Sequence, residues 1–195
     1  RDEVGGEVAV TAKTSLSDGY RGGLDVEEGL EYAQMLEADG NLDALQLSGG
    51  SSLMNPMYLF RGGAPVDEFA ASMPLLVKWG MKTVGRGFLK KCPFEEAYLR
   101  EKALKFRAGL SIDLMLLGGI NRRETMEQAM ADDFQFVAMA RALVHEPGLV
   151  NRLAARDVAG GACLHCNRCM PTIYADGGVV CPPQLEGRAT LAVGA

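Results

Sequence analysis

The chain has 195 residues, 48% of them hydrophobic, which is enough for one well-buried domain and short for two. Its formal net charge of −5 argues against nucleic acid as a partner, because no basic face offsets the acidic balance. The longest apolar stretches are only strand-sized and no secretory signal is visible, so we expect no membrane contact.

Short apolar runs separated by stretches of helical spacing predict strands alternating with helices. The predicted strands cover residues 7–13, 42–48, 113–118 and 134–140. The predicted helices cover residues 26–38, 94–110, 122–131 and 147–155. Asp25 is the expected N-cap of the first helix, and Glu95 and Glu96 suit the first turn of the second. Residues 51–92 are too long for an ordinary loop and predict an insertion at the active site, with one short helix near 70–79.

This alternation predicts a parallel sheet whose strands are adjacent in chain order, because helical crossovers join parallel strands. Four such units are half of a TIM (β/α)8 barrel, and an open doubly wound sheet is the rival arrangement. We therefore expect an α/β fold, with a half barrel over residues 1–158 and a Cys-rich C-terminal segment over 159–195. The chain begins at Arg1 in charged sequence, and we interpret it as a piece of a longer protein.

Two strand ends carry the residue types that hold a phosphate. Gly118 and Gly119 follow the third strand, and Ala140 and Arg141 follow the fourth. Small residues let backbone N–H groups approach an anion, and Arg141 adds a fixed positive charge. The alternative is that the glycines form ordinary turns and that Arg141 is a surface ion-pair partner.

Four of the five cysteines lie near the C-terminus in a spacing that suits a metal better than disulfides. They follow the pattern C-x2-C-x2-C-x11-C, at Cys163, Cys166, Cys169 and Cys181. Four thiolates can hold zinc or an iron–sulfur cluster, and His165 could replace one of them in a zinc site. The third possibility is that they bind no metal. Because the spacing does not favour disulfides, we expect a reducing, cytoplasmic location.

Several stretches together resemble the C-terminal half of the Old Yellow Enzyme family of FMN oxidoreductases, in its NADH:flavin oxidoreductase branch. They are residues 17–23 (SDGYRGG), 47–50 (LSGG), 117–120 (LGGI), 139–141 (MAR) and the cysteine run 163–169. The resemblance implies that Lys13 lies against the flavin N1/C2 carbonyl region. It also implies that Gly118, Gly119, Ala140 and Arg141 hold the FMN phosphate.

The cysteine run resembles that of the dienoyl-CoA reductase-like branch, which implies a [4Fe–4S] cluster. That branch has three residues between the second and third cysteines, where this chain has two (Asn167 and Arg168). The resemblance leaves the catalytic residues unassigned, because it places them in the N-terminal half of the barrel.

We therefore expect a fragment of an FMN-dependent NAD(P)H oxidoreductase of the ene-reductase type. It would pass a hydride from flavin N5 to an activated alkene or a similar small-molecule acceptor. The expected partners are the missing N-terminal half of the barrel and a second copy of the chain, and the fragment alone is expected to be inactive. The alternatives are a phosphate-binding isomerase or aldolase without flavin, and a structural half barrel that contains zinc.

Overall fold

The structure is a computed structural model that describes residues 2–89 and 91–186. The chain divides into two compact units. The first is formed by the described residues up to Leu59 and by Glu95–Met139. The second is formed by Phe60–Phe94 and by the described residues from Ala140 onward.

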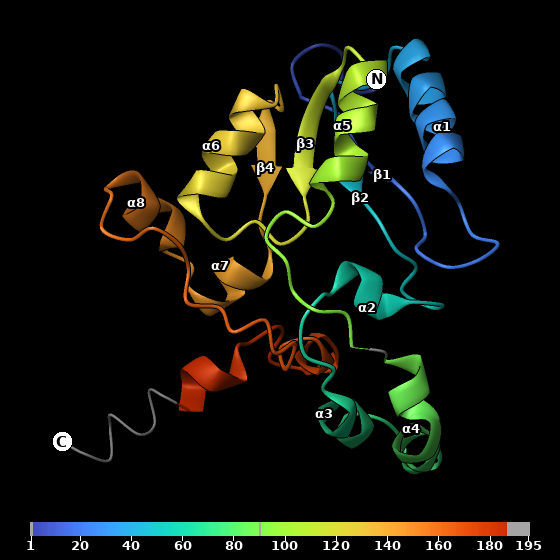
Figure 1. The fold of residues 1–195 in the computed structure, drawn as a ribbon, viewed down its shortest axis with the longest axis vertical. Coiled ribbons are helices and arrows are strands. Elements are labelled where there is room, and N and C mark those ends of the chain that lie inside the picture. Colours follow the sequence, from blue (N-terminus) through green and yellow to red (C-terminus); the bar gives the residue numbers. More distant parts are fainter. Residues whose placement is uncertain (1, 90, 187–195) are drawn as a thin grey trace. The chain divides into compact units, whose positions relative to one another are not determined.

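The first unit is built on a four-stranded parallel sheet with the strand order β1-β2-β3-β4 (Figure 1). The strands are β1 (Thr11–Ser15), β2 (Ala44–Ser48), β3 (Asp113–Leu117) and β4 (Phe136–Ala138). The prediction of parallel strands that are adjacent in chain order is confirmed. β1 starts later than the predicted 7–13, because residues 2–7 form turns that include Gly5 with a φ of +56°.

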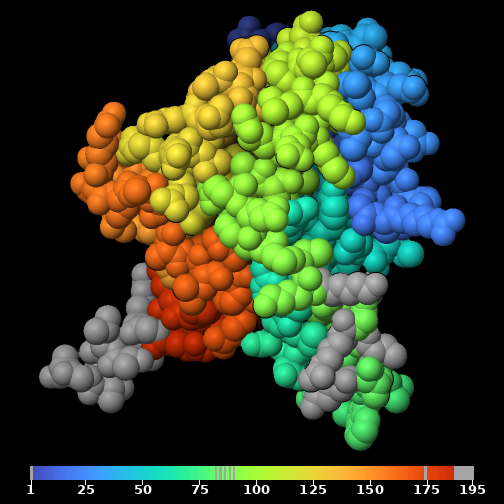
Figure 2. Space-filling view, viewed as in Figure 1, coloured from blue at the N-terminus to red at the C-terminus, as the bar shows by residue number. Residues whose placement is uncertain are grey.

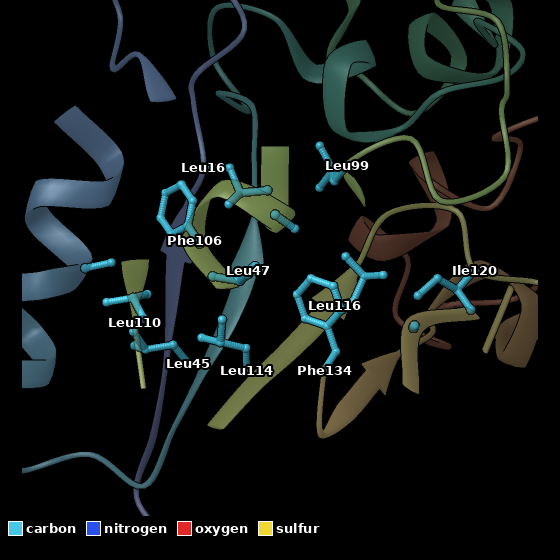
Figure 3. Packing of buried hydrophobic residues seen from close by; sticks show 13 residues of the cluster. Leu16, Leu45, Leu47, Leu99, Phe106, Leu110, Leu114, Leu116, Ile120 and Phe134 are labelled. Carbon is cyan, nitrogen blue, oxygen red and sulfur yellow. The ribbon is translucent and has the colours of Figure 1, made fainter. Parts of the chain in front are cut away.

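One face of this sheet is packed against helices. These are α1 (Val26–Ala38), α5 (Arg100–Gly109) and α6 (Arg123–Ala131). Their side chains join the leucines of β2 and β3 in one buried cluster, in which Phe106 of α5 lies beside Leu47 (Figure 3). α1 and α5 are in contact, as the blue and yellow-green atoms of Figure 2 show. Burying each leucine stabilises the unit by about 1.5–3 kcal/mol.

The opposite face of the sheet carries a row of residues in register across all four strands. Lys13 pairs with Gln46, Gln46 with Met115, and Met115 with Phe136. Lys13 is exposed and Phe136 is 47% exposed, so the two ends of this row are not packed into a core. Alternation along each strand therefore separates a leucine-rich buried face from a mixed face that is open at both edges.

The helix boundaries follow local chemistry. Asp25 is the N-cap of α1 as predicted: its side chain accepts from the N–H of Glu28, whose carboxylate accepts from the N–H of Asp25. The predicted helix 94–110 begins only at Arg100. The expectation that Glu95 and Glu96 form its first turn is wrong, because Ala97 has a φ of +50°, which a right-handed helix cannot contain.

The described residues of the insertion form three helices instead of one. α2 (Pro56–Leu59) belongs to the first unit, and α3 (Val66–Ala71) and α4 (Leu75–Phe88) belong to the second. The helix predicted near 70–79 is divided because Pro74 disfavours a helical conformation at the preceding residue. On α4, Leu75, Leu76 and Trp79 are 71%, 88% and 69% exposed.

The second unit also contains α7 (Arg141–His145), α8 (Leu149–Ala154) and a 3₁₀ helix (Pro171–Tyr174). α8 corresponds to the helix predicted at 147–155. Within the described ranges, every helix is too short or too polar to cross a bilayer.

Candidate functional site

The predicted flavin-facing cation, Lys13, lies inside β1 and not at its end. Its side chain is exposed on the open face of the sheet, beside Gln46 of β2. The structure records no hydrogen-bond acceptor for its ammonium group among the described residues, so its charge is available to a ligand. The role that the resemblance assigns to Lys13 stays a prediction.

The glycines after β3 adopt backbone conformations that other residues avoid. Gly118 has a φ of +118° and Gly119 a φ of +76°. A Cβ atom at Gly118 would lie 2.8 Å from Cγ of Leu99, and one at Gly119 would lie 2.8 Å from the ring of Tyr98. Neighbouring atoms leave no room for a side chain at either position, so close packing requires glycine at both. The absence of side chains would also let a ligand approach the backbone.

A carboxylate orders the chain immediately after these glycines. Oε1 of Glu96 accepts hydrogen bonds from the backbone N–H groups of Asn121, at 2.6 Å, and Arg122, at 2.8 Å. Both donors precede α6, where the helix dipole favours negative charge. Sequence reasoning placed Glu96 in a helix and missed this role, since no spacing links residue 96 to residue 121.

In the second unit, Ala140 is the N-cap of α7 and Arg141 is its first residue. Nη1 of Arg141 donates to the carbonyl oxygen of Arg61, at 2.7 Å, and to Oδ1 of Asn167, at 2.5 Å. Among the described residues the structure records no acceptor for Nε and Nη2. One edge of this half-buried guanidinium is thus held by the protein, and the anion-binding role of the other edge stays a prediction.

Asn167, between the second and third clustered cysteines, is 1% exposed and has a φ of +61°. Its Nδ2 donates to the carbonyl oxygens of Phe60, at 2.6 Å, and Gly63, at 2.8 Å. The backbone N–H of Gly63 in turn donates to the carbonyl oxygen of His165, at 2.8 Å. The cysteine loop is therefore bound to the segment 60–63, a connection that sequence reasoning did not anticipate.

His165 packs on a neighbouring ring. Its imidazole stacks on Phe94, with ring centroids 3.4 Å apart and an interplanar angle of 12°. Burial, aided by the positive charge of Arg141, lowers the pKa of His165 to about 4. The ring is therefore neutral at physiological pH.

The four clustered cysteines all line one small cavity of about 20 Å³, together with Arg141 and other side chains. Burial raises the pKa of the Cys163 and Cys169 thiols. Nearby thiols also raise these two pKa values, and the charge of Arg141 lowers them.

His145 also lines this cavity, with its Nδ1 3.3 Å from Sγ of Cys181. Across residues 2–89 and 91–186, no three or more His, Cys, Asp or Glu side chains are arranged to hold an ion. The predicted metal site therefore stays a prediction, although its four residues share one cavity.

A polar cluster in the first unit was not singled out from the sequence. Nζ of Lys102 donates to Oγ of Ser17, at 2.8 Å, and to the hydroxyl of Tyr58. The two hydroxyl oxygens are 3.2 Å apart. Ser17 and Lys102 also line an open groove of about 830 Å³ beside residues 19–28, which form the loop before α1 and the first turn of that helix. The three residues come from segments that are far apart in the sequence. Of the three, only Ser17 lies in a stretch that carries the family resemblance, residues 17–23.

The predicted site residues are divided between the two units. Lys13, Gly118 and Gly119 belong to the first unit, whereas Ala140, Arg141 and the four cysteines belong to the second. The expected convergence of the two strand ends on one phosphate stays a prediction.

Comparison with known proteins gives a sequence relative and several structural neighbours, one of which is described below. No family model matches the chain. The chain is 53% identical over 174 residues to the 4,4'-dithiodibutanoate disulfide reductase of Rhodococcus erythropolis. The match covers 89% of this chain and 43% of that protein. This chain thus spans less than half the length of its relative.

In structure, the chain resembles part of a 2-naphthoyl-CoA reductase that was solved in complex with 2-naphthoyl-CoA. The TM-score is 0.63 at 17% identity, and the match covers 92% of this chain and 23% of the reductase. At this identity the likeness shows a shared fold alone. The sequence similarity therefore relates the chain to an oxidoreductase, and the structural similarity relates it to an α/β fold that a second reductase uses.

Proposed function

We propose that this chain is part of an FMN-dependent oxidoreductase that takes electrons from NAD(P)H. The observation that carries this proposal is the 53% identity, over nearly the whole chain, to an enzyme named as a reductase. The similarity favours a redox enzyme over an isomerase, an aldolase or a purely structural zinc module. The chain would form the C-terminal half of a (β/α)8 barrel, as its four parallel strands and their open face suggest.

The residues present fit an FMN group. The Gly118–Gly119 turn has no side chains that would block a phosphate, and Arg141 keeps Nε and Nη2 for a bidentate contact with an anion. Lys13 supplies a cation that no described acceptor neutralises. When bound, FMN would supply the hydride-transfer chemistry.

Each of these residues has a separate task in the proposal. Gly118, Gly119, Ala140 and Arg141 would bind and orient the phosphate. Lys13 would stabilise the negative charge that develops at the N1/C2 region on reduction. The tasks of Arg141 and Lys13 are electrostatic, so each of these two can be tested by a substitution that keeps or removes the charge.

The acceptor is either an organic disulfide or an activated alkene. The relative's name favours the disulfide, because that enzyme is named for reducing 4,4'-dithiodibutanoate. The alkene is what the resemblance to the ene-reductase branch implies. We therefore put the disulfide first and keep the alkene as the second candidate.

The clustered cysteines would hold one metal centre. Thiolates fit both zinc and iron–sulfur clusters, and all four residues line the same cavity. Since the described side chains are not arranged around an ion, we derive no step of the reaction from such a centre.

The test uses the full-length protein that contains this chain. We expect it to purify with bound FMN, to be bleached by NADH or NADPH under anaerobic conditions, and to recover its colour when 4,4'-dithiodibutanoate is added. Recovery with an activated alkene, and not with the disulfide, would select the second acceptor. A colourless protein that does not bind added FMN would contradict the proposal.

A further inference from the structure

A single side chain, that of Asn167, joins the cysteine loop to Arg141. Asn167 uses its amide oxygen to accept from Arg141 and its amide nitrogen to donate to Phe60 and Gly63. Its exposed fraction is 1%, so water does not compete for these bonds. An amide has one acceptor and one donor end, and here both are used within the second unit.

The backbone at this position limits which residue can replace it. Asn167 has a φ of +61°, in the left-handed region that asparagine and glycine tolerate and most residues avoid. The left-handed turn lies between Cys166 and Cys169 and faces the segment that begins at Phe60. Asparagine therefore satisfies the backbone and the hydrogen bonds together.

The bond to Arg141 also fixes the direction of the guanidinium. Nη1 is held by Asn167 and by the carbonyl oxygen of Arg61, so Nε and Nη2 are directed away from these acceptors. Arg141 lines the same cavity as the four cysteines. A conformational change in the cysteine loop can therefore alter the direction of the Arg141 guanidinium through a single residue, Asn167.

We infer that Asn167 is a positioning residue that couples the cysteine loop to the anion-binding edge of Arg141. The inference rests on the proposed role of Arg141 in binding the FMN phosphate. It adds that a disturbance of the cysteine loop, by metal loss or thiol modification, weakens FMN binding without any direct contact between a cysteine and the flavin.

The test is a double-mutant cycle on FMN affinity in the full-length apoprotein, with Asn167→Gly and Arg141→Ala. Glycine removes the side chain and accepts the φ of +61° without strain. We expect Asn167→Gly to weaken FMN binding about tenfold and Arg141→Ala to weaken it ten- to a hundredfold, as for loss of a charged hydrogen bond. The double variant should bind no more weakly than Arg141→Ala alone, because Asn167 acts only through Arg141.

A second readout reports directly on the cysteine loop. Asn167→Gly should also raise the rate at which a thiol reagent labels the cysteines, whereas Asn151→Ala, at an exposed position on α8, should change neither FMN affinity nor labelling. Should the glycine variant not fold, Asn167→Asp serves instead. Its carboxylate keeps an acceptor for Arg141 but donates to neither the Phe60 nor the Gly63 carbonyl oxygen, and it should likewise weaken FMN binding and speed labelling.

The outcomes distinguish this inference from the proposal beneath it. Normal FMN binding by Arg141→Ala would overturn the phosphate role of Arg141, and the inference with it. The inference alone is overturned if Arg141→Ala weakens binding while Asn167→Gly does not. It is also overturned if the two effects multiply in the double variant.

Discussion

The Glu96 carboxylate accepts a 2.6 Å hydrogen bond from the backbone N–H of Asn121, across 25 residues of sequence. The contact fixes the backbone of the loop that follows β3 through a side chain from outside that loop. Its partners are backbone N–H groups at and just before the N-cap of α6, where donors have no partner within the helix. Glu96 is therefore a support for the predicted phosphate loop and not a member of it.

Replacing Glu96 should show this support directly. Glu96→Ala removes two charge-assisted hydrogen bonds and should lower the free energy of unfolding by about 2 kcal/mol. Glu96→Gln keeps an acceptor without the charge and should cost about half as much. Urea unfolding followed by circular dichroism measures both. Equal stability of Glu96→Ala and the unmodified protein would contradict the role.

Gly119→Ala tests the packing of the same loop. A Cβ atom there would lie 2.8 Å from the ring of Tyr98 and 2.9 Å from the carbonyl oxygen of Glu95, at a φ of +76°. We expect a loss of about 2–3 kcal/mol in stability, from strain and from displacement of the loop. Gly148→Ala is a suitable control, because a Cβ atom there meets nothing within 4 Å. Unchanged stability of Gly119→Ala would show that the loop can relax.

Lys13→Met should slow flavin reduction in the full-length protein. Without a cation near the developing negative charge, the rate of anaerobic bleaching by NAD(P)H should fall on the order of a hundredfold. Lys13→Arg keeps the charge and should retain most of the rate. Stopped-flow absorbance measures this rate, and a Lys13→Met variant as fast as the unmodified protein would remove Lys13 from the proposed site.

Metal analysis of anaerobically purified full-length protein tests whether the four clustered cysteines bind a metal. We expect about four iron or about one zinc per chain. Cys166→Ser should lower this content, whereas Cys92→Ser should not, because Cys92 is not among the residues that line the cavity. Metal content near zero, with all four thiols freely titratable, would show that these cysteines bind no metal.

An ion pair makes the stability of the first unit depend on pH. Nε and Nη2 of Arg100 donate to the two carboxylate oxygens of Asp132, at 2.5 and 2.8 Å, and the first cause of the lowered Asp132 pKa is this contact. A lowered folded-state pKa means that the stabilisation is present above the unfolded-state pKa, near 3.9, and is lost as the pH falls through the lower folded-state value.

Asp132→Asn should therefore destabilise the protein at neutral pH, and this penalty should shrink as the pH falls below about 3.9 and through the lowered folded-state pKa of Asp132. Glu31→Gln, at an exposed position on α1, is the control. Unfolding by urea at several pH values measures the difference. A penalty for Asp132→Asn that is the same at both ends of the range would contradict this account.

Periodicity was sufficient to predict the sheet. The apolar pattern that buries Leu45, Leu47, Leu114 and Leu116 is local, so it is visible in the sequence, and the helices between the strands predict the parallel strand order. The start of α5 was not predictable in this way. It depends on the left-handed conformation of Ala97 and on the distant partners of Glu96.

The candidate site likewise has features that could be predicted from the sequence and others that could not. The spacing of the four cysteines predicted a shared location, and the structure places them on one cavity. The contacts of Asn167 with Phe60 and Arg141 span 107 and 26 residues and follow from tertiary folding. Lys102, Tyr58 and Ser17 meet for the same reason, and no local pattern marks such a cluster.

The exposed position of Trp79 has a consequence for spectroscopy. It is the only tryptophan in these 195 residues, and it lies on α4, in a different unit from the leucine-rich sheet. Since 69% of it is already exposed, its emission would shift little when the chain unfolds. Tryptophan fluorescence from this chain would therefore report on α4 and miss the melting of the core, whereas protection of the β2 and β3 amides from hydrogen exchange would follow it.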